Sequence, residues 1–207
     1  MSPPTPPVTK RPLLVYIHGF LSSSHSAKAE ETAHFLRDQP VAFRCPQLSD
    51  YPDQAWASLV ALAEAAAAEA RPLALIGSSL GGYYATALAE RYGLRAVVIN
   101  PAVQPAIHRF HAYLGPQHNP YTGHRFTLTE SHRQALAAID PAPLQRPDNL
   151  WLLAQSGDEV LDYRHAMDFY AGCRQTIEPG GNHRFDDYAR HLPAICAFLG
   201  LPLAAAT

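Results

Sequence analysis

Charged side chains are scarce in this sequence. Asp, Glu, Lys and Arg make up 16% of the 207 residues, well below the roughly 25% that is typical of soluble domains, whereas hydrophobic residues make up 47%. The formal net charge is −2, so the chain offers no basic field that would attract a polyphosphate. These values predict extensive burial or an apolar cavity, and they argue against nucleic acid as a partner.

Long apolar runs and paired cysteines are also missing. No stretch approaches the ~18 consecutive apolar residues of a membrane-spanning helix, so we expect no membrane span. The cysteines Cys45, Cys173 and Cys196 are odd in number and widely spaced, which argues against a disulfide framework or a zinc site. The start lacks a secretory signal, in which positive charge precedes an apolar stretch. We therefore expect reduced thiols in a cytoplasmic protein.

Proline is concentrated at the start, and residues 1–12 are predicted to form a disordered arm. Residues 13–204 are long enough for one domain with its own core and too short for two ordinary ones. Within them, short apolar runs alternate with segments of helical composition. Most runs are nearly continuous, which is typical of parallel strands covered on both faces. The predicted strands are Leu13–Ile17, Val41–Cys45, Leu73–Gly77, Ala96–Asn100, Leu150–Gln155 and Arg174–Glu178.

Helices are expected between these strands, at Ser26–Asp38, Asp53–Arg71, Gly82–Tyr92 and Asp162–Gly172. The regular alternation of strands and helices, joined by short links, predicts βαβ units. Such units build a compact three-layer α/β sandwich with a mostly parallel sheet of about six strands. The segment 101–148 interrupts this alternation. It is rich in Pro, His and aromatic residues, with a weak helix near Ser131–Ala138. An excursion of this length between core strands predicts a lid or a substrate pocket.

The pattern Gly77-Ser78-Ser79-Leu80-Gly81 lies between a predicted strand and a predicted helix. In that context a G-x-S-x-G sequence is typical of a nucleophile elbow, a sharp turn that exposes the serine hydroxyl. The flanking glycines are needed because a Cβ there would collide with the neighbouring strand or helix. Ser79 is therefore the candidate nucleophile.

A serine hydroxyl needs a base to accept its proton, and the candidate is His183, on a glycine-rich loop after the last predicted strand. The base needs an orienting carboxylate, and Asp158 follows the strand Leu150–Gln155. Serine, acid and base occur in the chain order of such hydrolases, just past strand ends, where open α/β sheets place their sites. The alternatives for the acid are Glu159, Asp162, Asp186 and Asp187.

The oxyanion formed during acyl transfer needs preorganised N–H donors. The Leu80 amide follows the nucleophile directly, and the amide of Phe20 or Leu21 would come from the loop after the first strand, which His18 would organise. The aromatic residues of the excursion are expected to cover an apolar groove. The candidate pocket residues are Leu21, Tyr113, Tyr121 and Phe126.

Metal and cofactor sites are not expected. Four histidines of the excursion have no carboxylate or cysteine at ligand spacing, and an H-x-x-H pair alone is a weak signal. They are His108, His111, His118 and His124.

Several long strings of residues resemble the YqiA-type esterases, a bacterial branch of the α/β-hydrolases, in order from about Leu14 to Leu199. The resemblance implies a compact α/β-hydrolase with Ser79, Asp158 and His183 as the triad, acting on carboxylic esters or acyl-CoA thioesters. The strings are His18-Gly19-Phe20-Leu21-Ser22-Ser23, Gly77-Ser78-Ser79-Leu80-Gly81-Gly82-Tyr83-Tyr84-Ala85-Thr86, Asn100-Pro101-Ala102, Asn119-Pro120-Tyr121-Thr122-Gly123, Gly157-Asp158-Glu159-Val160-Leu161-Asp162-Tyr163-Arg164, Cys173-Arg174-Gln175-Thr176 and Gly180-Gly181-Asn182-His183.

The sequence thus predicts a serine hydrolase that cleaves small-molecule acyl esters through a covalent acyl-enzyme on Ser79, as a monomer or small homo-oligomer. One alternative is an acyl-CoA thioesterase with the same triad, whose phosphate-binding rim would come from Arg109, Arg125 and Arg133. Another is a hydrolase-fold ligand-binding or sensor protein with little turnover. An intact triad argues against the sensor.

Overall fold

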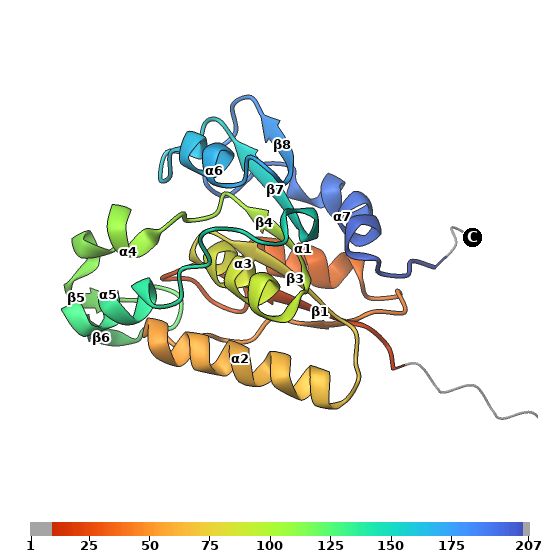
Figure 1. Cartoon of the computed structure of the whole chain (residues 1–207), viewed down its shortest axis with the longest axis horizontal. Coiled ribbons are helices and arrows are strands. Elements are labelled where there is room, and N and C mark those ends of the chain that lie inside the picture. Colours follow the sequence, from red (N-terminus) through yellow and green to blue (C-terminus); the bar gives the residue numbers. More distant parts are fainter. Residues whose placement is uncertain (1–9, 205–207) are drawn as a thin grey trace, which may run out of the picture.

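The computed structural model of the protein describes residues 10–204, and at its centre is a sheet of six strands (Figure 1). The strand order is β2-β1-β3-β4-β7-β8, and every neighbouring pair is parallel. This confirms the predicted α/β sandwich, and each strand end lies within one residue of its prediction. The strands are β1 (Leu13–Ile17), β2 (Ala42–Arg44), β3 (Leu73–Ser78), β4 (Arg95–Ile99), β7 (Leu150–Gln155) and β8 (Arg174–Glu178).

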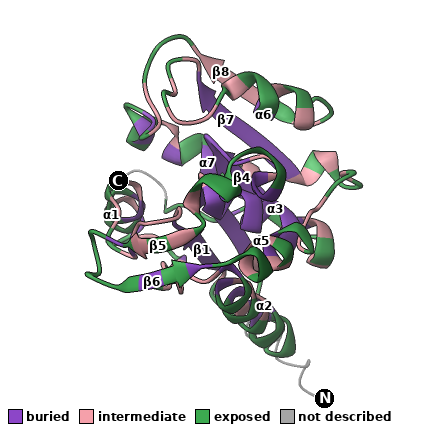
Figure 2. Ribbon diagram, turned by 90° about the vertical axis from the view of Figure 1, so that its left-hand side faces the viewer, coloured by how far each residue is buried: buried purple, intermediate pink, exposed green. Residues whose placement is uncertain are grey.

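Helices cover both faces of the sheet, because side chains along a strand point alternately to opposite faces. In β1, Leu14 and Tyr16 belong to one core, and Val15 and Ile17 belong to the other. Buried strands accordingly run between helices whose outer sides are exposed (Figure 2). The first core is closed by α1 (Ala27–Phe35) and α7 (Leu192–Leu199), and the second by α2 (Pro52–Ala68), α3 (Leu80–Tyr92) and α6 (Tyr163–Phe169).

The last helix, α7, and the 3-10 turn η3 (Tyr188–His191) before it were not among the predicted elements. The segment is strongly apolar, and Ile195 and Cys196 are fully buried against the sheet. The turn matters for the site, because it continues directly from the loop that carries His183.

The excursion 101–148 contains more structure than the one weak helix expected. Its strands β5 and β6 form an antiparallel hairpin that was not predicted. Phe126 and Leu136 pack into the same core as α2 and α3, so the excursion, green in Figure 1, is packed onto one end of the sheet. Its elements are α4 (Pro105–His108), η1 (Phe110–Tyr113), β5 (Gly115–His118), β6 (Arg125–Leu128), α5 (Glu130–Ala137) and η2 (Pro147–Asn149).

A buried asparagine ties the hairpin to the loop after β1. The Asn119 amide nitrogen donates to the Ser22 carbonyl at 3.1 Å and to an Asp50 carboxylate oxygen at 2.8 Å. Its side-chain oxygen accepts from the Tyr121 amide at 3.0 Å. All its polar atoms are thus satisfied inside the protein, and the turn of the hairpin lies beside the loop expected to bind the oxyanion.

The predicted disordered arm covers residues 1–12, of which residues 1–9 lie outside the described part of the chain. Just after them, the chain forms backbone hydrogen bonds where it enters the sheet. The Pro12 carbonyl accepts from the Ala42 amide at 2.8 Å, and the Leu13 amide donates to the Pro72 carbonyl at 2.8 Å. Between residues 10 and 204, no helix combines the length and the apolar character that crossing a membrane requires.

Candidate active site

Ser79 occupies the turn between β3 and α3, with the backbone strain expected of an elbow. Its φ of 55° and ψ of −124° lie outside the usual regions for a residue with a side chain. The glycines make this possible. A Cβ on Gly77 would lie 2.7 Å from the Ala85 methyl, and one on Gly81 would overlap the carbonyl oxygens of Ile17 and His18. The collisions expected from the sequence are therefore present.

His183 reaches Ser79 from the loop after β8. Its Nε2 lies 3.1 Å from the Ser79 Oγ, and its side chain is 20% exposed. The loop is fixed by Asn100, which follows β4 and is buried with a φ of 40°. The Asn100 amide nitrogen donates to the carbonyls of Asn182 and His183, at 3.0 and 3.1 Å. Asn100 was recognised only as part of a family string, because nothing local to it predicts a contact 83 residues away.

Asp158 lies on the far side of the imidazole. Its two carboxylate oxygens are 2.9 and 2.8 Å from the His183 Nδ1, and the side chain is only 1% exposed. One oxygen also accepts from the amides of Val160 and Leu161, at 2.8 and 2.9 Å. A carboxylate can only accept, so the Nδ1 carries a proton and the Nε2 is free to accept from the Ser79 hydroxyl.

The alternative carboxylates have other partners. Glu159 accepts from the backbone amide of His183 at 3.0 Å, and this bond lowers the pKa of the Glu159 carboxyl. Asp162 caps α6 by accepting from the Arg164 amide, and Asp186 accepts from the Asn182 side chain. Asp187 forms no hydrogen bond to the imidazole among the described residues. The structure therefore brings Asp158, and none of its rivals, to the His183 ring.

The expected oxyanion donors lie beside Ser79. A Cβ on Gly19 would be 3.1 Å from the Ser79 Cβ, so the loop after β1 passes directly over the elbow. Within residues 10–204, the Phe20 and Leu80 amides donate to no protein acceptor. Phe20 and Ser79 line one and the same cavity. Leu80 also begins α3, whose N-terminus favours negative charge.

His18 organises that loop from within. Its Nδ1 donates to the Gly19 carbonyl at 2.9 Å, and its Nε2 accepts from the Leu48 amide at 3.1 Å. This requires a neutral ring, and burial lowers the pKa of His18 from its ordinary value of 6.5. The side chain has no free nitrogen for proton transfer, in agreement with the organising role expected from the sequence.

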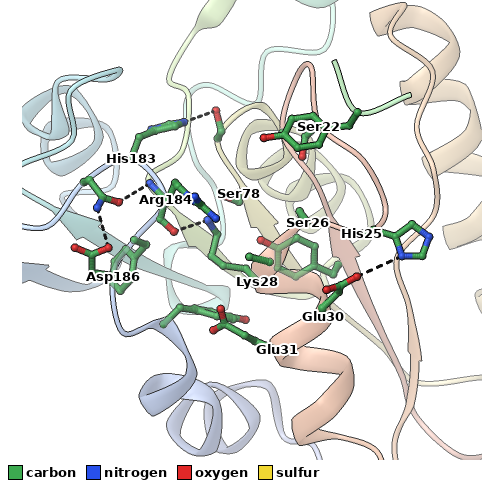
Figure 3. Close-up of a pocket in the computed structure, with 18 of the residues that line it drawn as sticks. Ser22, His25, Ser26, Lys28, Glu30, Glu31, Ser78, His183, Arg184 and Asp186 are labelled. Carbon is green, nitrogen blue, oxygen red and sulfur yellow. Dashed lines mark hydrogen bonds and ion pairs between the residues drawn. The ribbon is translucent and has the colours of Figure 1, made fainter. Parts of the chain in front are cut away.

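A cavity of about 870 Å³ opens beside Ser79 and His183. Figure 3 shows residues that line it, His183 among them. Two of the four candidate pocket residues, Leu21 and Tyr121, line it. The other two do not. Tyr113 and Phe126 pack around the Phe20 ring, with centroids 5.2 and 6.2 Å away, and so support the loop after β1. The expected apolar groove is not seen at this cavity, whose walls include Lys28, Glu30, Glu31, Arg184, Asp186 and Asp187.

The four histidines of the excursion do not gather. His108 stacks on His165, and the His124 Nδ1 lies 2.9 Å from an Asp50 carboxylate oxygen. In the described part of the chain, no three His, Cys, Asp or Glu side chains lie close enough together to hold a metal ion.

Comparisons with known proteins identify the fold and the family. Residues 13–200 match the profile of a family described as "Uncharacterised protein family (UPF0227)". Est1E from Butyrivibrio proteoclasticus, solved with ferulic acid bound, is 16% identical with a TM-score of 0.69, over 92% of this chain and 88% of that one. Mouse alpha/beta hydrolase domain-containing protein 10 is 19% identical with a TM-score of 0.68, over 91% and 88%.

A third solved structure, described as a member of the a/b serine hydrolases without a lid, comes from Xanthomonas campestris. It is 17% identical with a TM-score of 0.62, over 99% of this chain and 88% of that one. At these identities the likenesses show the fold alone, and the fold is that of the α/β-hydrolases.

The neutral, buried His18 predicts a loss of stability in acid. Because its folded pKa lies below 6.5, the unfolded chain binds more protons in the interval between the two values, and stability rises with pH there. Acidification through about pH 6.5 should therefore lower the free energy of unfolding, by at most about 1.4 kcal/mol per pH unit for this one proton. Urea unfolding between about pH 7.5 and pH 5 measures this free energy. In His18→Asn the free energy of unfolding should depend less steeply on pH than in the wild type. An identical pH dependence would contradict a neutral, buried His18.

Proposed function

The chain belongs to the UPF0227 family, the YqiA-like esterase family that its motifs resemble, and on this basis we propose that it is a serine hydrolase of carboxylic esters. The observation that carries the proposal is the continuous chain of contacts from Ser79 through His183 to Asp158, at 3.1 and 2.8 Å. Hydrolysis of an ester by an activated serine requires a nucleophile, a base and an orienting acid in this mutual arrangement.

The first half of the reaction forms the acyl-enzyme. The His183 Nε2 accepts the Ser79 proton as the Oγ attacks the carbonyl carbon, and the carbonyl electrons move to the oxygen, where the amides of Phe20 and Leu80 stabilise the negative charge. Asp158 stabilises the imidazolium. The carbonyl then re-forms, the bond to the alcohol oxygen breaks, and His183 gives its proton to that oxygen.

The second half releases the acid. A water molecule replaces the alcohol beside His183, loses a proton to the Nε2 and attacks the acyl carbon. The tetrahedral intermediate collapses, the bond to the Ser79 oxygen breaks, and the proton returns from His183 to the serine. The buried carboxylate of Asp158 keeps the same imidazole tautomer available in both halves.

The thioesterase alternative is disfavoured by the charges at the cavity. Acyl-CoA would bring several phosphate charges, but the carboxylates that line the cavity outnumber its cations, Lys28 and Arg184. The carboxylates, all exposed, are Glu30, Glu31, Asp186 and Asp187. None of the three arginines suggested for a basic rim lines it. Arg109 donates to the Val160 carbonyl, Arg133 pairs with Glu130, and Arg125 lies on β6. We therefore favour oxygen esters over acyl-CoA.

The sensor alternative is disfavoured by the strained turn at Ser79. A residue held in this conformation costs on the order of 1–3 kcal/mol. A protein that only binds a ligand gains nothing from keeping a hydroxyl in that position, in contact with a histidine whose tautomer a buried carboxylate fixes.

Substitution of Ser79 tests the nucleophile. Ser79→Ala should lower kcat/KM for a p-nitrophenyl ester by at least about 10³-fold, because among residues 10–204 no other hydroxyl is hydrogen-bonded to the His183 Nε2. Initial rates monitored by nitrophenolate release measure this. If Ser79→Ala and wild type hydrolyse the ester at comparable rates while both remain folded by circular dichroism, the assignment is wrong.

Substitution of Asp158 tests the acid. In Asp158→Asn the amide would favour the wrong imidazole tautomer, so kcat should fall on the order of 10³-fold or more. The matched control is Asp162→Asn, which keeps a residue that caps helices well and should change kcat by less than about twofold. Equal effects of the two substitutions on kcat would refute the role of Asp158.

The ionic-strength dependence of turnover tests the choice between ester and thioester. Repulsion between the carboxylates at the cavity and the CoA phosphates is screened by salt. We expect kcat/KM for a short acyl-CoA to be low at about 20 mM salt and to rise at about 300 mM, whereas a neutral ester should change little. A fall in acyl-CoA turnover with added salt would indicate a basic CoA site instead.

A further inference from the structure

Charged side chains of both signs line the large cavity beside Ser79. Four exposed carboxylates come from the start of α1 and the loop after β8, and the exposed Arg184 lies among them. Lys28, the one lysine that lines the cavity among residues 10–204, is half-buried. In Figure 3, Lys28 reaches from α1 toward Arg184, while His25 and Glu30 lie on the opposite side. Substrate pockets are usually lined mainly by apolar side chains, so such walls indicate a polar ligand group.

Lys28 has unused hydrogen-bonding capacity. Its ammonium donates to the Arg184 carbonyl at 2.7 Å, the one side-chain bond it makes among the described residues. An ammonium has three donors, so two remain. Burial lowers the pKa of Lys28 to about 8, which leaves the group charged but poorly hydrated at neutral pH. A polar ligand oxygen would replace part of the lost hydration.

Two orphaned hydroxyls line the same cavity. Among residues 10–204, the only buried side-chain polar atoms without a hydrogen-bond partner are the Tyr16 hydroxyl and the Ser26 Oγ, and both residues are in its wall. Tyr16 is 1% exposed. An unsatisfied buried hydroxyl costs about 1–3 kcal/mol and is unusual in native proteins. That both occur here is a second, independent sign of a ligand.

The position of His183 shows which part of an ester would enter. If the proposed mechanism holds, His183 gives its proton to the leaving alcohol oxygen, so the alcohol must lie on the His183 side of Ser79. The cavity runs along residues 182–189 of the His183 loop and η3, and along α1. It therefore borders the place where the alcohol part of the substrate leaves.

We propose that this cavity binds a neutral, polyhydroxylated alcohol and that the preferred substrates are its short acyl esters. This rests on the proposed esterase function. Each hydroxyl of such an alcohol can accept from Lys28, Tyr16 or Ser26 and donate to a carboxylate such as Glu31. An anionic alcohol would meet the four exposed carboxylates. A cationic alcohol could lie beside those carboxylates but would be repelled by the half-buried Lys28, and both a cation and an alkyl chain would leave the Lys28 donors unpaired.

A series of acetate esters that differ only in the alcohol tests the proposal. The alcohols are hexanol, glycerol, glucose, choline as the cation and glycolate as the anion. We expect kcat/KM for the glycerol and glucose monoesters to exceed that for hexyl acetate by tenfold or more, with choline and glycolate esters below both polyol esters. Highest turnover of the hexyl, choline or glycolate ester would overturn the proposal.

Three substitutions test whether the cavity wall causes that preference. For each variant we measure one ratio, kcat/KM for glucose monoacetate divided by kcat/KM for hexyl acetate. Lys28→Met, Tyr16→Phe and Ser26→Ala should each lower the ratio, Lys28→Met by about five- to tenfold. Lys10→Met, which removes a lysine paired with Glu69 away from the cavity, should leave it unchanged. A merely structural role would leave the ratio unchanged in all the variants, and that result would refute the proposal.

The ratio separates this proposal from others. Because Lys28 also holds the Arg184 carbonyl, Lys28→Met is expected to slow the hydrolysis of every ester, but that effect cancels in the ratio. Among residues 10–204 the Tyr16 and Ser26 hydroxyls have no partner at normal hydrogen-bond geometry, although Ser78 lies near enough to the Tyr16 hydroxyl to influence its pKa. Tyr16→Phe and Ser26→Ala should therefore fold normally. If p-nitrophenyl acetate is hydrolysed and the alcohol preference is absent, only this proposal fails. If no ester is hydrolysed, the proposed function fails with it.

Discussion

Helix α3 passes so close to the end of strand β1 that only a hydrogen atom fits at Gly81. A side chain there would overlap the carbonyl oxygens of Ile17 and His18. This approach brings the two halves of the site together, because Ser79 precedes Gly81 on one element and the loop with Phe20 follows β1 on the other. It also explains the strained turn at Ser79, since the chain must reverse direction within a few residues to begin α3 against β3.

His183 is positioned by a different principle. Its loop is anchored in the core by the buried Phe185, and polar side chains from several elements hold its backbone. Asn100 after β4 donates to two of its carbonyls, and Lys28 of α1 donates to the Arg184 carbonyl. Gln155 at the end of β7 bonds to the backbone of Asn182 and Asp186, and Glu159 accepts from the His183 amide. Substitutions in these residues should therefore act on His183 through its loop. Lys28 would contribute twice, to the loop and to the proposed alcohol site.

The sequence predicted what depends on local patterns. Short apolar runs, most of them nearly continuous, indicated the six core strands, and the elbow with two strand ends indicated the triad candidates. Features that depend on distant contacts were missed. The hairpin strand Gly115–His118 is polar and contains a proline, so no alternation marks it. Aromatic residues such as Phe126 gave no sign of whether they line a cavity or support Phe20. The polar cavity brings together Lys28 and Arg184, 156 residues apart.

The most direct test of the central claim is the site of covalent modification by a fluorophosphonate. The reagent phosphonylates a serine only where a base activates the hydroxyl and donors stabilise the developing charge. After labelling, digestion and mass spectrometry should place the adduct on Ser79, and Ser78→Ala should keep the label. An adduct on another residue, or no adduct on a folded protein, would contradict the account.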